Sequence, residues 1–170
     1  MRIGDESAYF IEKEIIPSAL GLLPARMSSP EAVAMLLAIG LQESRFEHRK
    51  QIGGPAHGFW QFERNGGVKG VLGHVSTRPI IVPILNLLGY RSASLADERA
   101  QCYAAIVHND VLACVFARLL LWTLPGAIAS YEHERKAWGQ YLDAWRPGKP
   151  HPETWHDCWI TAWDMVDDNS

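Results

Sequence analysis

The strongest feature of the hydrophobic pattern is a run over residues 32–41 in which every position is apolar or glycine. A helix that is apolar on all faces is buried, whereas a surface helix is apolar along one stripe only. Ser29, Pro30 and Glu31 precede the run and form a typical helix start, with an N-cap hydroxyl, a proline in the first turn and an early acid. The pattern predicts a central buried helix that ends near Ser44.

The other segments with helical spacing are shorter and are separated by glycine and proline. We expect helices over residues 6–16 (ending at Pro17), 78–88, 95–107, 110–122, 132–145 and 151–165. Residues 50–58 read as a loop, residues 58–63 as a short extended piece, and residues 66–73 as a poor helix because of their four glycines. No internal repeat or long linker divides the chain. The sequence predicts one mostly α domain over residues 1–170, with little or no strand.

Composition and charge exclude several classes of protein. Hydrophobic residues make up 48% of the chain and charged residues 21%, which is typical of a globular protein. The net charge of −3 is not gathered into blocks, so we expect no nucleic-acid partner. No uncharged apolar run reaches the roughly 20 residues that span a bilayer, so stable membrane insertion is not expected. The charged N-terminus predicts synthesis in the cytoplasm without a signal peptide.

Cysteines and histidines indicate neither a disulfide framework nor a metal site. The three cysteines are odd in number and widely spaced, and we interpret them as reduced, mostly buried thiols: Cys102, Cys114 and Cys158. The histidines lack the spacing of a zinc-binding helix. We therefore expect neither a metal nor a cofactor.

Glu43 is the first candidate for chemistry, because it lies at the polar end of the central helix. A carboxyl group there leaves an apolar core and sits at the negative end of the helix dipole, and both effects raise its pKa. A carboxyl that stays protonated near neutral pH suits a general acid. From position alone, an ion pair with an arginine at the rim of the core is an equally good interpretation.

The residues that follow favour the general acid. Residues 43–46 (Glu-Ser-Arg-Phe) precede a glycine-rich loop, and residues 58–62 (Gly-Phe-Trp-Gln-Phe) follow it. This pair of motifs resembles that of the lysozyme-like superfamily, specifically soluble lytic transglycosylases and phage-encoded peptidoglycan hydrolases. The resemblance is strongest over residues 29–73.

The resemblance implies a lysozyme-like fold and cleavage of the β-1,4 bond between N-acetylmuramic acid and N-acetylglucosamine in peptidoglycan. It implies that Glu43 is the catalytic acid and base, that Ser44 is the serine beside it and binds substrate, and that Gln61 lines the cleft and contacts substrate near the acid. In the transglycosylase branch the 6-hydroxyl of the sugar attacks and leaves a 1,6-anhydro end. A hydrolytic muramidase would use water instead.

The chain departs from the family pattern at three places. The Ala-Tyr-Asn-Ala-Gly motif is missing; Tyr141 is its nearest counterpart, either beside the acid or as a half-buried helix tyrosine. Trp60 replaces a smaller residue next to Gln61 and is a candidate substrate contact. Glu63 is either a second carboxylate that positions water or a solvated loop residue.

Five of the seven tryptophans lie within residues 132–166. Three of them share one helix face: Trp155, Trp159 and Trp163. Such spacing favours a core position over a surface that stacks on sugar rings. A sugar-binding module would need this face to be exposed.

The net charge also bears on how the protein reaches an anionic cell wall, because a free lysin gains encounter rate from basic charge. A mildly acidic enzyme is better delivered by a particle, so we expect peptidoglycan strands as substrate and phage virion or tail proteins as possible partners. The protein would be made in the host cytoplasm and act on the cell wall. The alternative is a phage virion structural or assembly protein with the same fold and little or no activity.

Overall fold

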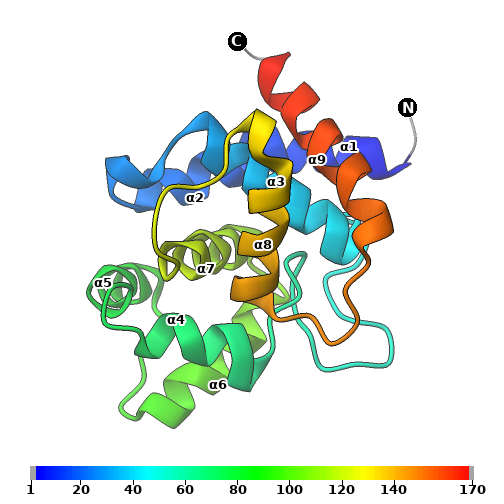
Figure 1. Cartoon of the computed structure of the whole chain (residues 1–170). Helices are drawn as coiled ribbons and strands as arrows, with labels where there is room; N and C mark the ends of the chain where they lie inside the picture. The colour runs from blue at the N-terminus through cyan, green and yellow to red at the C-terminus, as the bar shows by residue number, and fades with distance from the viewer. Residues whose placement is uncertain (1–2, 169–170) are drawn as a thin grey trace.

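Helix α3 (Pro30–Ser44) lies at the centre of the fold, as its apolar pattern predicts (Figure 1). The hydroxyl of Ser29 caps it by accepting a hydrogen bond of 3.1 Å from the backbone nitrogen of Ala32. Residues 34–40 are all buried. Its most extensive packing partner is α9 (Pro152–Asp167), which follows more than a hundred residues later in the chain.

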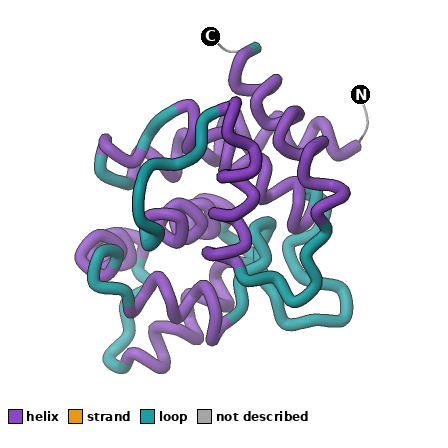
Figure 2. The backbone as a smooth tube through the Cα atoms, viewed as in Figure 1, coloured by secondary structure: helices purple, strands orange, loops and turns teal. Residues whose placement is uncertain are grey.

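The computed structural model describes residues 3–168, and within this range the chain is mostly helical and forms no strand (Figure 2). This confirms the expected fold class at the level of an all-α protein. The remaining helices are α1 (Ile3–Phe10), α2 (Ile16–Leu22), α4 (Lys69–Gly73), α5 (Arg78–Leu88), α6 (Leu95–Ile106), α7 (Asp110–Trp122) and α8 (Glu134–Trp145), and short 3-10 turns occur at Ala25–Met27 and Tyr131–His133.

The N-terminal helix differs from the prediction, because it does not end at Pro17. A π-helical turn (Ile11–Ile15) joins α1 to α2, and Pro17 lies in the first turn of α2. A proline is tolerated at that position because backbone N–H groups of a first turn have no partner within their own helix. The helical path therefore continues to Leu22.

The stretch from residue 58 to residue 63 also differs from the prediction, whereas residues 66–73 are helical as expected. Residues 57–62 form a tight turn rather than an extended piece, with His57 and Phe62 exchanging two backbone hydrogen bonds of 2.8 Å. After it, a π-helical turn (Arg64–Val68) leads directly into α4. Gly67 is required by packing, because a Cβ there would lie 2.5 Å from the ring of Phe62.

The tryptophans of the C-terminal helices belong to the core. Trp155, Trp159 and Trp163 are 2%, 0% and 7% exposed, which confirms the core interpretation. Their face of α9 is therefore not available to stack on sugar rings, and a sugar-binding module built on it is excluded.

The three cysteines are free thiols, as expected: Cys102 and Cys114 are buried and Cys158 is half-buried. Burial raises the pKa of Cys102 to about 12 and that of Cys158 to about 11. Over residues 3–168 no single helix is long and apolar enough to cross a membrane; two helix pairs reach that length and hydropathy only together, across bends of 104° and 118°.

Candidate active site

A cleft of about 1080 Å³ opens at the C-terminal end of α3. Its walls come from the loop after α3, from the turn and helices of residues 61–70, and from the C-terminal ends of α7 and α8 with the loop that follows α8. Five of the residues proposed from the sequence line it together: Glu43, Ser44, Gln61, Glu63 and Tyr141.

Glu43 lies in the last turn of α3. The helix ends immediately after Ser44, because Arg45 and Phe46 adopt left-handed conformations with φ of 53° and 54°. Burial raises the pKa of Glu43 to about 7, and a hydrogen bond from Tyr141 lowers it by a smaller amount. A carboxyl group with this pKa is about half protonated at neutral pH and can both donate and accept a proton there.

Tyr141 is the direct partner of Glu43. Its hydroxyl donates a hydrogen bond of 2.6 Å to Oε1 of Glu43. Burial and the charge of Glu43 raise the pKa of Tyr141 above its usual value, so the phenol keeps its proton and remains a donor. Of the two interpretations that the sequence left open, the structure places Tyr141 beside the acid, although its ring is also buried.

The ring of Tyr141 is held by aromatic neighbours from two helices. It stacks on Trp155 of α9, with 5.3 Å between ring centroids and 10° between ring planes. Trp138, one turn earlier on α8, packs against the same ring at 5.3 Å. The aromatic cluster thus fixes the direction in which the Tyr141 hydroxyl points.

Ser44 lines the cleft, but its hydroxyl forms structural hydrogen bonds with the backbone. It donates to the carbonyl oxygen of Phe59 at 2.7 Å and accepts from the backbone nitrogen of Phe46 at 3.1 Å. These bonds tie the end of α3 to the turn at residues 57–62. The hydroxyl of Ser44 therefore positions this turn, and a contact of Ser44 with substrate stays a prediction.

Trp60 does not belong to the cleft. Its side chain is 0% exposed, and its indole nitrogen donates a hydrogen bond of 2.8 Å to the carbonyl oxygen of Leu36 in α3. The expectation that Trp60 contacts substrate is therefore wrong. The physical reason is the packing of the turn at residues 57–62 against α3, which places the indole in the core beside Leu36.

Gln61 and Glu63 remain at the cleft wall. The side-chain nitrogen of Gln61 donates a hydrogen bond of 2.8 Å to the carbonyl oxygen of Gly58, which holds the side chain within its own turn. Glu63 is exposed and directly precedes the π-helical turn. Glu63 thus has the access to solvent that a water-positioning carboxylate needs, and a solvated loop residue would have the same access.

The sequence reasoning missed several cleft residues. Asp143 and Arg146 at the end of α8, and Lys149 and His151 in the loop after it, line the same cleft. Residues 146–150 are rich in proline and glycine, which indicates a loop between two helices but not the surface against which it lies.

Comparison of the chain with protein-family models, with curated proteins and with solved structures found no match. The site is therefore interpreted from its own chemistry. Its central element is a part-buried carboxyl–phenol pair at the wall of a large cleft.

Proposed function

We propose that this protein cleaves the β-1,4 glycosidic bond between N-acetylmuramic acid and N-acetylglucosamine in peptidoglycan, with Glu43 as the general acid. The observation that carries the proposal is the pair of Glu43, with a pKa raised to about 7, and Tyr141, 2.6 Å from it, in an open cleft. The motifs at residues 43–46 and 58–62 support the choice of substrate. A lysozyme-like architecture is part of the same proposal.

In this reaction the protonated carboxyl of Glu43 gives its proton to the glycosidic oxygen while the bond to the anomeric carbon breaks. The carboxylate that forms is stabilised by the hydrogen bond from the Tyr141 hydroxyl. Glu43 then takes a proton from the attacking hydroxyl group, either the 6-hydroxyl of the same sugar or a water molecule. One enzymic carboxylate suffices when the N-acetyl group of the substrate stabilises the anomeric centre.

The dimensions of the cleft support a polymeric substrate. Its volume of about 1080 Å³ exceeds the roughly 300–1000 Å³ of ordinary small-molecule pockets. Several separate segments line it. His48 and Gln51 come from the loop after α3, and His74 and Leu124 come from later parts of the chain. A glycan strand can lie along such a groove and present an internal bond to the acid.

The decisive experiment replaces Glu43 by Gln, which keeps the shape of the side chain and its ability to accept the Tyr141 hydrogen bond. We expect loss of release of soluble glycan from purified peptidoglycan by at least about a hundredfold. Glu47→Gln is the matched control, because Glu47 is an exposed carboxylate just beyond α3 and does not line the cleft. Retained cleavage by the folded Glu43→Gln variant, or no cleavage by the unmodified protein, would overturn the proposal.

A further inference from the structure

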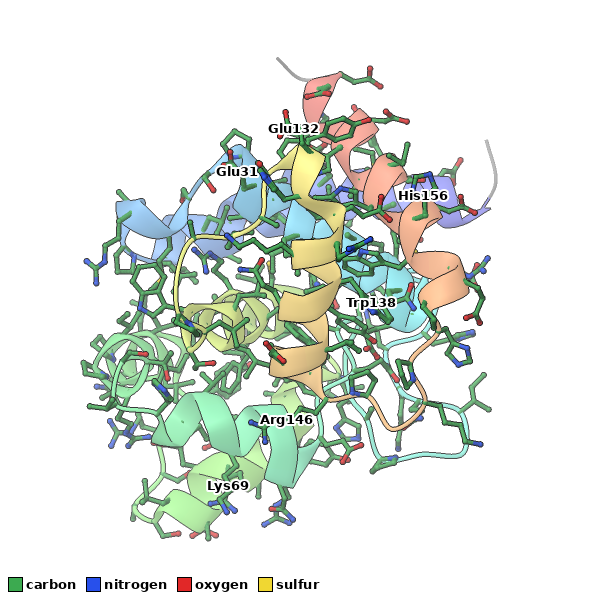
Figure 3. The ribbon with its side chains drawn as sticks, viewed as in Figure 1. Glu31, Lys69, Glu132, Trp138, Arg146 and His156 are labelled. Carbon is green, nitrogen blue, oxygen red and sulfur yellow. The ribbon has the colours of Figure 1, made fainter. Side chains whose placement is uncertain are left out.

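One wall of the cleft carries positive charge on a chain whose net charge is −3. Arg146 and Lys149 both line the cleft, and both side chains are exposed. Neither forms an ion pair with a carboxylate of residues 3–168; Arg146 donates only to the backbone oxygen of Asp143, at 3.4 Å. Figure 3 shows Arg146 at the lower end of α8, beyond Trp138 on the same helix.

The loop that carries these two residues is held at both ends by neighbours of the proposed reaction centre. At its start, the indole nitrogen of Trp145 donates a hydrogen bond of 2.8 Å to the carbonyl oxygen of Trp60. At its end, the side-chain nitrogen of Gln42 donates a hydrogen bond of 3.0 Å to the carbonyl oxygen of His151. Pro147 and Pro150 further restrict the backbone between these two points.

The position of the loop relative to the acid follows from helix geometry. Arg146 comes five residues after Tyr141, so it lies about 7.5 Å farther along the axis of α8. The other end of the loop is bonded to Gln42, the residue before Glu43. The loop that carries the positive charges is therefore joined to segments that adjoin Glu43, and its two cations line the same cleft as the acid.

Besides Glu43, two carboxylates line the cleft. Glu63 lies on the segment before α4, and Asp143 lies three residues before Arg146 on α8. Counting Asp143, Arg146 and Lys149, the α8 wall still carries a surplus of one positive charge at neutral pH. Unpaired cations of this kind favour an anionic group on the ligand.

We propose that Arg146 and Lys149 form a subsite for the carboxylates of the peptide that branches from N-acetylmuramic acid. The inference rests on the proposed function and narrows its substrate to peptide-bearing glycan strands. The N-acetylated sugars of the backbone carry no charge, so the peptide carboxylates are the anionic groups nearest to the cleaved bond. Guanidinium and ammonium groups bind carboxylates through charge-assisted hydrogen bonds.

The test compares two substrates: solubilised peptidoglycan strands that keep their peptides, and the same strands after enzymatic removal of the peptides and conversion of the lactyl carboxylates released by that step to neutral amides. The double variant Arg146→Asn with Lys149→Gln removes both charges, and asparagine suits the left-handed conformation of Arg146 (φ 49°). We expect its KM for peptide-bearing strands to rise about tenfold with kcat within about twofold, and no change on peptide-free strands.

The control is the double variant Arg135→Gln with Lys136→Gln, which removes two exposed positive charges from the first turns of α8, outside the cleft. It should leave both KM values unchanged. The charge-conserving pair Arg146→Lys with Lys149→Arg should keep most of the affinity. Added salt should raise the KM of the unmodified protein for peptide-bearing strands only.

Each outcome has a defined meaning. Equal loss on both substrates, or no loss on either, would overturn the peptide subsite while leaving cleavage itself intact. A similar rise in KM for the Arg135 and Lys136 control would also overturn it, because the effect would then come from overall charge. Failure of the unmodified protein to cleave either substrate would instead contradict the proposed function.

Discussion

The rings of Tyr141 and Trp155 lie 10° from parallel with their centroids 5.3 Å apart, and the hydroxyl of Tyr141 contacts Glu43. The relationship joins three helices, because Trp155 belongs to α9, Tyr141 to α8 and Glu43 to α3. A ring held by its face cannot swing away from the carboxyl without breaking the stack. The environment of Glu43 is therefore set by the packing of the C-terminal helices against the central one.

Removing the Tyr141 hydroxyl should shift the pH dependence of activity. The hydrogen bond favours the ionised carboxylate and so lowers the pKa of Glu43; in Tyr141→Phe the pKa should rise above about 7. We expect the alkaline limb of kcat/KM against pH to move to higher pH and the maximal rate to fall about tenfold. Tyr131→Phe, an exposed tyrosine outside the cleft, should leave the profile in place. An unshifted limb in Tyr141→Phe would contradict the assignment.

The raised pKa of Glu43 also predicts a pH-dependent effect of Glu43→Gln on stability. The carboxyl has a pKa of about 7 in the folded state and 4.5 as its ordinary value, so the fold favours its protonated form. The contribution of Glu43 to the free energy of unfolding, relative to the Glu43→Gln variant, is therefore fully present below about pH 4.5. It is lost as the pH rises through about 7.

We compare the free energy of unfolding of the variant with that of the unmodified protein. This difference should shift in favour of the variant by about 3 kcal/mol between low pH and pH 8. Urea denaturation of both proteins at about pH 4.5 and pH 8 measures this shift. A difference that does not change with pH would mean that Glu43 is not desolvated.

Replacing Glu63 by Gln separates the two possible products of cleavage. If Glu63 positions a water molecule, the unmodified protein gives reducing ends, and Glu63→Gln lowers the rate about a hundredfold. If the sugar hydroxyl attacks instead, the products carry 1,6-anhydro ends and the substitution changes the rate less than about threefold. Mass spectrometry of digested peptidoglycan distinguishes the two. Because Glu63 is exposed, thermal stability should not change in either case.

Gly40 is needed for the chain to turn back after Glu43. A Cβ at this position would lie 2.2 Å from the ring of Phe46, which is 1% exposed and packs edge-on against Phe59 and Trp60. Gly40→Ala should therefore destabilise the protein by about 1–3 kcal/mol, in spite of the better helix propensity of alanine.

The matched control for this prediction is Gly139→Ala in α8, where a Cβ would meet nothing within 4 Å. That variant should be more stable by up to about 1 kcal/mol. Denaturant midpoints of the two variants measure both effects. Equal stabilisation by the two alanines would show that the Phe46 ring can move.

The sequence predicted those features that depend on local pattern. An all-apolar run with a serine cap is sufficient to locate a buried helix, and α3 begins and ends where that pattern does. The spacing of Trp155, Trp159 and Trp163 likewise indicated a core face. Glu43 could be proposed from the sequence because its position at the end of a buried helix follows from the pattern of that helix alone.

Features that depend on tertiary contacts were missed or left open. The partner of Glu43 is 98 residues away in the chain, so only the packing of α8 and α9 brings Tyr141 to it. The expectation for Trp60 was wrong because only the packing of the turn at residues 57–62 against α3 shows that its side chain lies in the core. The π-helical turn before Pro17 has no local sequence signal either.

Both neighbours of Glu43 in the chain use their side chains for structural hydrogen bonds. Gln42 binds the backbone of His151 and accepts a hydrogen bond from Thr154, while Ser44 binds the backbone of Phe59. We therefore expect a saturation scan of residues 42–44 to give two outcomes. Substitutions at residues 42 and 44 should lower the yield of folded protein, and substitutions at residue 43 should leave that yield unchanged. If Glu43 is the acid that we propose, a single substitution at residue 43 would remove turnover and leave the fold intact, because the structural hydrogen bonds belong to its two neighbours.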